Sequence, residues 1–310
     1  MQPPIVSVQA QPLDATTWTA LAQRVEADGY DALLAADHPG TTASPFVALA
    51  AAAAVTERIG VGTYVSQAGV REPLLLASDV ATLDVISNGR ARLGLGAGHT
   101  PAEWDMVGAE RPDVAGRVRR FQAVAEACRA LLAGETVTID GPEVRAHQAR
   151  LTNPRPVQER IPITFGGANT SLLRLAGAQA DIVGLSGLGR TLPDGYLHEV
   201  RWNGADIDRQ IDLIEQGAFG RATAPAREAF VQMVEVTDDA EKAAHEIAQR
   251  LHCSAAEVIA SPYAWIGTVE EIGAALTAHE LRWGITRYVI REAYLDAADQ
   301  VRAHLSRAAG

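Results

Sequence analysis

Short apolar runs and amphipathic, alanine-rich segments alternate along the whole chain, and this alternation limits the possible folds more than any other feature. The runs that read as strands are residues 5–10, 31–37, 58–68, 91–98, 163–168, 181–186, 229–237 and 287–292. Segments with helical periodicity follow them at 16–28, 45–56, 73–87, 114–133, 171–179, 206–218, 239–251 and 296–308.

Strands that are apolar throughout are typical of parallel sheets covered on both faces. Eight strand–helix units in 310 residues predict an α/β fold, a TIM (β/α)8 barrel. A doubly wound sheet, the alternative, has fewer strands per domain.

Two segments interrupt this rhythm. Residues 135–151 alternate polar and apolar side chains around Gly141-Pro142, which predicts a small β-hairpin excursion. Residues 187–206 are polar and glycine-rich, and are long for a loop that joins a strand to a helix. Long loops in compact domains are usually lids or binding loops. No linker composition appears, so we expect one domain over residues 1–310.

Composition and charge exclude several classes of function. The net charge of −11 argues against a nucleic-acid partner, because such proteins need a clustered basic face. No apolar stretch has the length of a membrane helix, and no signal peptide is visible, so we expect a cytoplasmic protein without a membrane partner. Cys128 and Cys253 lie far apart and the histidines occur singly, which predicts neither a disulfide nor a metal site.

The run "RARLGLGAGHT" (90–100) contains Gly94, Gly96 and Gly98 and resembles a dinucleotide-binding loop only in part. That fingerprint needs a third glycine or alanine where His99 stands, and a helix that opens at once. The interpretation that remains is a barrel strand whose glycines leave room for something close to the backbone.

A second glycine pair, Gly166-Gly167, is followed by Asn169 and Thr170, which could cap a helix whose first amides face an anion. A plain left-handed turn is the alternative.

Several blocks together resemble the bacterial luciferase-like superfamily. They are residues 29–38, 57–98, 102–108, 155–168 and 178–186, while "ASPYAWIGTVEEI" (260–272) resembles most the branch of oxidoreductases that use the deazaflavin coenzyme F420. The resemblance covers essentially the whole chain. It implies a TIM barrel that binds coenzyme F420, or FMN as the alternative, together with a small-molecule substrate, and a homodimer.

The resemblance also implies positions for the cofactor. Asp37 and His38 correspond to the pair beside the ring, and a non-proline cis peptide is expected at about Tyr64–Val65 behind it. Gly96 and Gly98 would let the cofactor approach. Gly166, Gly167 and Ala168 would bind its phosphate.

Two residues depart from the sugar-phosphate and alcohol dehydrogenases of this family. Thr42, which we expect near the substrate, stands where those enzymes have tryptophan, and His99 where they have glutamate. We therefore expect hydride transfer with another small organic substrate, such as reduction of an activated C=C, C=O or C=N bond.

His38 is the first candidate for the proton donor or acceptor of such a reaction, and His99 is the second. A structural histidine is the alternative for each. Asp37 could orient His38, accept a hydrogen bond from the ring, or only cap the strand.

For the other side chains near the expected site, substrate contact and packing are both possible interpretations. Tyr196, His198 and Trp202 in the long loop are the candidates for substrate contact, whereas Trp104, beside Glu103, is expected to pack under a helix. The competing functions are an FMN-dependent monooxygenase of the same superfamily and a non-catalytic flavin-binding protein.

Overall fold

The computed structural model describes residues 3–192 and 198–309 of the chain. It divides into two compact units. Unit 1 comprises Met1–Gln9, Gly167–Arg190 and His198–Gly310, and unit 2 comprises Ala10–Gly166 and Thr191–Leu197. The single domain expected over residues 1–310 concerns both units together and stays a prediction.

Unit 2 is built on parallel strands. These are β2 (Ala32–Ala35), β3 (Gly60–Thr63), β4 (Ser66–Gln67), β5 (Ala91–Gly96) and β8 (Ile163–Gly166). Strand β3 pairs with β2 and β5, and β5 pairs further along with β4 and β8. Leu33, Leu93 and Phe165 are almost fully buried, as strands covered on both faces require.

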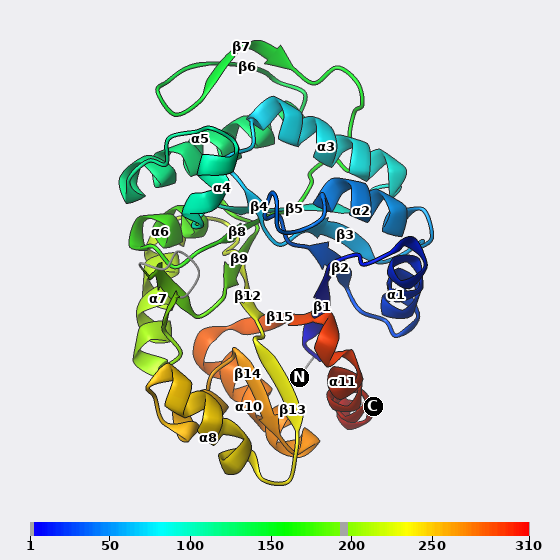
Figure 1. The fold of residues 1–310 in the computed structure, drawn as a ribbon, viewed down its shortest axis with the longest axis vertical. Coiled ribbons are helices and arrows are strands. Elements are labelled where there is room, and N and C mark those ends of the chain that lie inside the picture. The colour runs from blue at the N-terminus through cyan, green and yellow to red at the C-terminus, as the bar shows by residue number, and fades with distance from the viewer. Residues whose placement is uncertain (1–2, 193–197, 310) are drawn as a thin grey trace. The chain divides into compact units, whose positions relative to one another are not determined.

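The helices of unit 2 are α1 (Ala15–Ala27), α2 (Pro45–Ala53), α3 (Pro73–Ile86), α4 (Pro101–Met106) and α5 (Val114–Leu132). Three of them begin with proline, whose fixed φ suits the first helical position. In Figure 1, α2 and α3 lie side by side next to β3 and β5. The expected hairpin is present as β6 (Thr136–Asp140) and β7 (Arg145–Arg150), which pair antiparallel.

Unit 1 contains the parallel strands β1 (Ile5–Ala10), β9 (Ile182–Leu185), β12 (Ala226–Phe230) and β15 (Ile285–Arg291), paired in the order β1-β15-β12-β9. Its helices are α6 (Thr170–Gln179), α7 (Gly204–Ala218), α8 (Ala240–Leu251), α9 (Ala255–Ile259), α10 (Val269–Trp283) and α11 (Leu295–Ala309), with a 3-10 turn at Glu292–Tyr294. Two small sheets accompany them: β10 (Leu188–Thr191) with β11 (His198–Val200), and β13 (Met233–Val236) with β14 (Ala264–Gly267).

Parallel strands alternate with helices eight times along the chain, through β1, β2, β3, β5, β8, β9, β12 and β15, so the predicted TIM (β/α)8 fold is confirmed. The seventh unit is larger than expected. The predicted strand 229–237 is two strands, because the backbone N–H of Val231 still donates to β15 whereas that of Gln232 turns to the carbonyl of Tyr263. Strand β14 and helix α10 follow, and neither was predicted.

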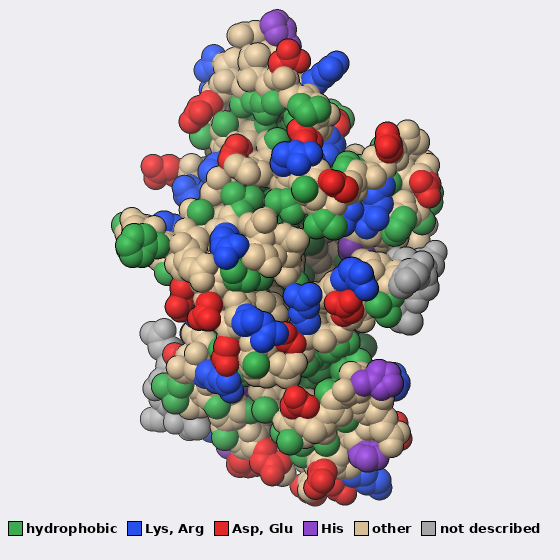
Figure 2. All heavy atoms as spheres, turned by 90° about the vertical axis from the view of Figure 1, so that its left-hand side faces the viewer, with side chains coloured by type: hydrophobic (Ala, Val, Ile, Leu, Met, Phe, Trp, Pro, Cys, Tyr) green, Lys and Arg blue, Asp and Glu red, His purple; other side chains and the backbone are tan. Residues whose placement is uncertain are grey.

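The surface carries no continuous basic patch on the face drawn in Figure 2, where positive and negative side chains are interspersed. In the part of the chain that the structure describes, no helix is both long and apolar enough to cross a membrane.

Candidate active site

His38 and Glu103 form a close pair in unit 2. His38 lies just beyond β2, and Glu103 lies in the first turn of α4, which follows β5. The Nδ1 atom of His38 is 2.6 Å from Oε1 of Glu103. Glu103 is buried, whereas the His38 side chain is 38% exposed. Since a carboxylate only accepts hydrogen bonds, Nδ1 carries the proton and Nε2 is left for a ligand.

The charge of Glu103 controls the charge of His38. The pKa of His38 is raised above its ordinary value, chiefly by the hydrogen bond to Glu103, while burial opposes the rise and the charges of Glu103 and Asp37 add to it. The site therefore stabilises the imidazolium form of His38 relative to a free imidazole. A histidine in this state can donate a proton from Nε2.

The backbone of His38 is fixed by the turn that follows it. Thr42 accepts a hydrogen bond from the His38 N–H at 2.9 Å and donates one to its carbonyl at 3.2 Å. The N–H groups of Thr41 and Thr42 donate to the same carbonyl. The Thr42 hydroxyl, expected near the substrate, is thus engaged in holding His38.

Asp37 is tied to Arg71 rather than to His38. Its carboxylate accepts two hydrogen bonds from Arg71, at 2.5 and 2.8 Å, and one from the backbone N–H of Gln67. Asp37 is buried, and the ion pair raises the pKa of Arg71. Asp37 therefore joins β2 to the segment between β4 and α3, and the group that orients His38 is Glu103.

His99 lies next to His38, with ring centroids 5.7 Å apart in an edge-to-face arrangement. It is exposed, and Arg111 donates a hydrogen bond to its backbone carbonyl. The two histidines proposed for proton transfer are therefore brought together, one held by a buried carboxylate and the other open to solvent.

The glycines of β5 lie against the bulge between β3 and β4. A Cβ on Gly96 would lie 2.6 Å from Cγ2 of Val65, and one on Gly94 would collide with the Thr63 carbonyl oxygen. A Cβ on Gly166 would lie 3.1 Å from Cγ1 of Val65. The space beside these glycines is filled by the bulge between β3 and β4, which contains the cis peptide Tyr64–Val65 that the family resemblance implies. Gly94, Gly96 and Gly166 therefore admit the bulge, and the expected approach of a cofactor beside Gly96 and Gly98 stays a prediction.

Several buried polar atoms around this bulge have no hydrogen-bond partner among the described residues. They are Oγ of Ser66, both amide atoms of Gln67 and Oε2 of Glu103. Gln67 also lies against Gly98, whose φ is +75° and whose Cβ would be 2.9 Å from the Gln67 side chain. Buried polar groups are normally paired. Val65 is partly exposed, so a ring could lie against it. A ring with amide and carbonyl groups at its edges would supply hydrogen-bond partners for the unpaired atoms of Ser66 and Gln67.

The remaining candidates belong to unit 1 or fall outside the described residues. Gly167 and Ala168 precede α6, whose N-cap Asn169 accepts hydrogen bonds from Ser171 and Leu172. Trp202 is buried and packs against Tyr263, with ring centroids 6.0 Å apart. His198 lies in β11, while Tyr196 lies outside the described residues. Among the residues that the structure describes, no cluster of three or more His, Cys, Asp or Glu could hold a metal ion.

Sequence reasoning missed Glu103, Arg71 and Gln67. Glu103 was treated only as a neighbour of Trp104, although a carboxylate in the first turn after a barrel strand lies where such folds place functional groups. Arg71 and Gln67 follow the bulge directly. Asp37 is a buried carboxylate that needs hydrogen-bond donors. Donors for it could have been predicted at the end of the neighbouring strand, where Gln67 and Arg71 lie.

Comparison with known proteins matches most of the chain to one family model. A family model described as luciferase-like monooxygenase matches residues 5–283. The F420-dependent glucose-6-phosphate dehydrogenase of Beutenbergia cavernae is 34% identical over 193 residues, 59% of this chain and 56% of that protein. The chain thus spans little more than half the length of that curated relative.

Solved structures share the fold over nearly the whole chain. The coenzyme F420 dependent tetrahydromethanopterin reductase from Methanopyrus kandleri has a TM-score of 0.74 at 20% identity, covering 97% of this chain and 98% of that one. The oxygenating constituent of 3,6-diketocamphane monooxygenase from Pseudomonas putida, in complex with FMN, has a TM-score of 0.72 at 16% identity, covering 98% and 96%. At these identities the likeness shows the TIM-barrel fold alone.

Proposed function

This chain belongs to the luciferase-like monooxygenase family, and from that premise we propose that it is a coenzyme F420-dependent oxidoreductase acting on a small organic substrate. The observation that carries the proposal is the His38–Glu103 pair, which holds the imidazole at Nδ1, raises its pKa and leaves Nε2 available. When bound, the deazaflavin supplies or accepts a hydride. The protein then has to position the substrate and manage one proton.

The residues around the bulge would hold the ring. Val65 offers an apolar surface, while Ser66 and Gln67 offer unpaired hydrogen-bonding atoms. Gly98, beside Gln67, would border the same edge. Gly166, Gly167 and Ala168, with the first turn of α6, would hold the phosphate, because helix N-termini favour anions.

His38 would donate or accept the proton. Reduction of an activated C=C, C=O or C=N bond leaves negative charge on the substrate, which a nearby acid must neutralise. The imidazolium of His38 can donate from Nε2 while Glu103 holds Nδ1. In the opposite direction the neutral imidazole would accept the proton. His99, which is exposed and lies edge to face with His38, would exchange that proton with solvent.

Direct binding tests the choice of cofactor. The purified protein is expected to bind oxidised coenzyme F420 more tightly than FMN, because the F420-dependent glucose-6-phosphate dehydrogenase of Beutenbergia cavernae is similar to 59% of this chain. Titrating each cofactor and following intrinsic tryptophan fluorescence measures both dissociation constants. Micromolar FMN binding without F420 binding would overturn the proposal and favour the FMN-dependent monooxygenase. Binding of a flavin with neither hydride transfer nor oxygen consumption would favour a non-catalytic flavin-binding protein.

We further propose a homodimer formed through one face of α2 and α3. Val47 of α2 is 73% exposed, and Leu74, Leu75, Val85 and Ile86 form an exposed apolar stripe along α3. Helical spacing places Leu74 and Leu75, near the start of α3, on the same side of the helix as Val85 and Ile86 near its end, with Ser78 and Thr82 between them. Exposed apolar patches of this kind mark interaction sites.

The dimer is tested by light scattering during size-exclusion chromatography. The unmodified 32.8 kDa chain is expected at twice its mass. The double variant Leu75→Glu/Ile86→Glu is expected at the monomer mass, because it places charge on the apolar stripe. Leu281→Glu, at a residue of α10 that is 77% exposed, is the matched control and should remain dimeric. A monomeric unmodified protein would contradict the proposal.

A further inference from the structure

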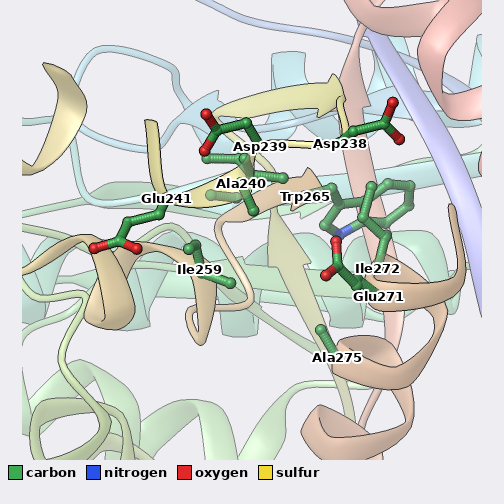
Figure 3. A pocket seen from close by; sticks show the side chains of 11 residues that line it. Asp238, Asp239, Ala240, Glu241, Ile259, Trp265, Glu271, Ile272 and Ala275 are labelled. Atoms are coloured by element: carbon green, nitrogen blue, oxygen red, sulfur yellow. The ribbon is translucent and has the colours of Figure 1, made fainter. Parts of the chain in front are cut away.

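A pocket of about 420 Å³ lies within unit 1, away from every residue assigned above. It is bordered by the loop that joins β13 to α8, by α9, by β14 and by the first turns of α10. Figure 3 shows the side chains that line it. Its volume falls in the range of small-molecule sites.

The charged groups that line this pocket are all acidic. Asp238, Asp239 and Glu241 come from one wall and Glu271 from α10, and no Lys, Arg or His is among the described residues that line it. Asp239 and Glu271 each use one oxygen to cap a helix, accepting from the N–H of Lys242 and Thr268 respectively. Asp238 and Glu241 are exposed and serve no helix cap. Negative potential of this kind attracts a cation.

This lining suits an organic cation better than a metal ion. Within the described ranges, no group of three or more acidic, histidine or cysteine side chains could hold a metal. The lining also includes apolar side chains, among them Ile259 and Ile272. An apolar body with a positive end matches such a lining.

Trp265 supplies an independent indication of a ligand. Its side chain is only 1% exposed and lines the pocket, yet its Nε1 has no hydrogen-bond partner in the described part of the chain. In Figure 3 the edge of the indole that carries the nitrogen is turned toward the other lining residues. An indole N–H only donates, and leaving a buried donor unpaired is unfavourable. The missing partner is an acceptor oxygen.

We infer that this pocket binds a small organic cation, a protonated amine with an apolar portion and a hydroxyl, ether or carbonyl oxygen. The carboxylates of Asp238 and Glu241 attract the ammonium group. The oxygen accepts from Nε1 of Trp265, and the apolar portion lies over Ile259 and Ile272. The site is formed by residues of unit 1 alone. It is separate from the chemistry of His38.

The probe is 2-phenoxyethylamine, which combines an ammonium group, an ether oxygen and an aromatic body. The chain has five tryptophans, so a nitrogen-15 NMR spectrum contains five indole N–H signals, and loss of one in Trp265→Phe identifies that of Trp265. Adding the probe to the unmodified protein is expected to move this signal along a saturable curve. In Asp238→Asn/Glu241→Gln the dissociation constant is expected to rise about tenfold, since two attractive charges are lost.

Two controls separate this site from other causes. Glu235→Gln removes an exposed carboxylate of β13 that does not line the pocket, and should leave the dissociation constant unchanged. The uncharged analogue 2-phenoxyethanol should bind far more weakly. The inference is overturned by any of three results: equal binding of the uncharged analogue, an unchanged constant in the double variant, or a Trp265 signal that stays still up to about 10 mM probe. Coenzyme F420 binding is a separate measurement, so failure here leaves the proposed function untouched.

Discussion

Replacement of His38 by alanine is expected to lower the turnover number by roughly 10²- to 10⁴-fold, the usual contribution of a general acid or base. The dissociation constant of coenzyme F420 should stay nearly unchanged, because the atoms assigned to the ring belong to Val65, Ser66 and Gln67. The imidazole is held at Nδ1 by Glu103 and presents only Nε2. The measurement is the rate at which reduced F420 is consumed with an activated double-bond substrate, alongside a fluorescence titration of the cofactor.

Two histidine variants show whether the loss is specific. His147→Ala, at an exposed position of β7, should leave both quantities unchanged. His99→Ala should lower turnover less than His38→Ala, because His99 is exposed and its ring meets that of His38 edge to face. Unaltered turnover in His38→Ala would remove His38 from the mechanism. Loss of cofactor binding would assign it to the cofactor site instead.

The strand–helix alternation was predictable because a strand buried on both faces must be apolar throughout, and a covering helix must be amphipathic. The sequence therefore indicates β2, β5 and β8 and the helices after them. The hairpin at 135–151 was equally clear from alternation around Gly141-Pro142. Helix α10 was missed, although Thr268 and Glu271 form a capping box at its start.

The site was less predictable because its contacts join residues far apart in sequence. His38 and Glu103 are 65 positions apart, and periodicity holds no information about which carboxylate meets which imidazole. The glycines at 94 and 96 illustrate the same limit. Their pattern correctly indicates close approach, but only the register of β5 beside the bulge shows that Val65 and Thr63 occupy the space.

Replacement of Glu103 by glutamine should move the pH dependence of catalysis to lower pH. The pKa of His38 is raised chiefly by Glu103, and burial opposes that rise, so removing the carboxylate charge lowers the pKa. In the reductive direction the reaction needs the imidazolium, whose population falls as pH rises through this pKa. Turnover of Glu103→Gln should therefore fall most on the alkaline side, by roughly 10- to 100-fold for loss of a charged hydrogen bond.

The pH at which turnover declines distinguishes an effect of the Glu103 charge from a loss of structure. An NMR titration of the His38 ring should show its pKa lowered in Glu103→Gln, whereas Asp105→Asn, an exposed carboxylate on the same helix, should leave it unchanged. Glu103→Asp keeps the charge and should restore part of the alkaline activity. A variant with reduced turnover but an unmoved His38 pKa would mean that Glu103 only supports the packing of α4. In the direction of substrate oxidation the reaction needs the neutral imidazole, so Glu103→Gln should extend activity toward lower pH. Opposite effects of this substitution on the two directions would identify the proton on His38 as the one transferred.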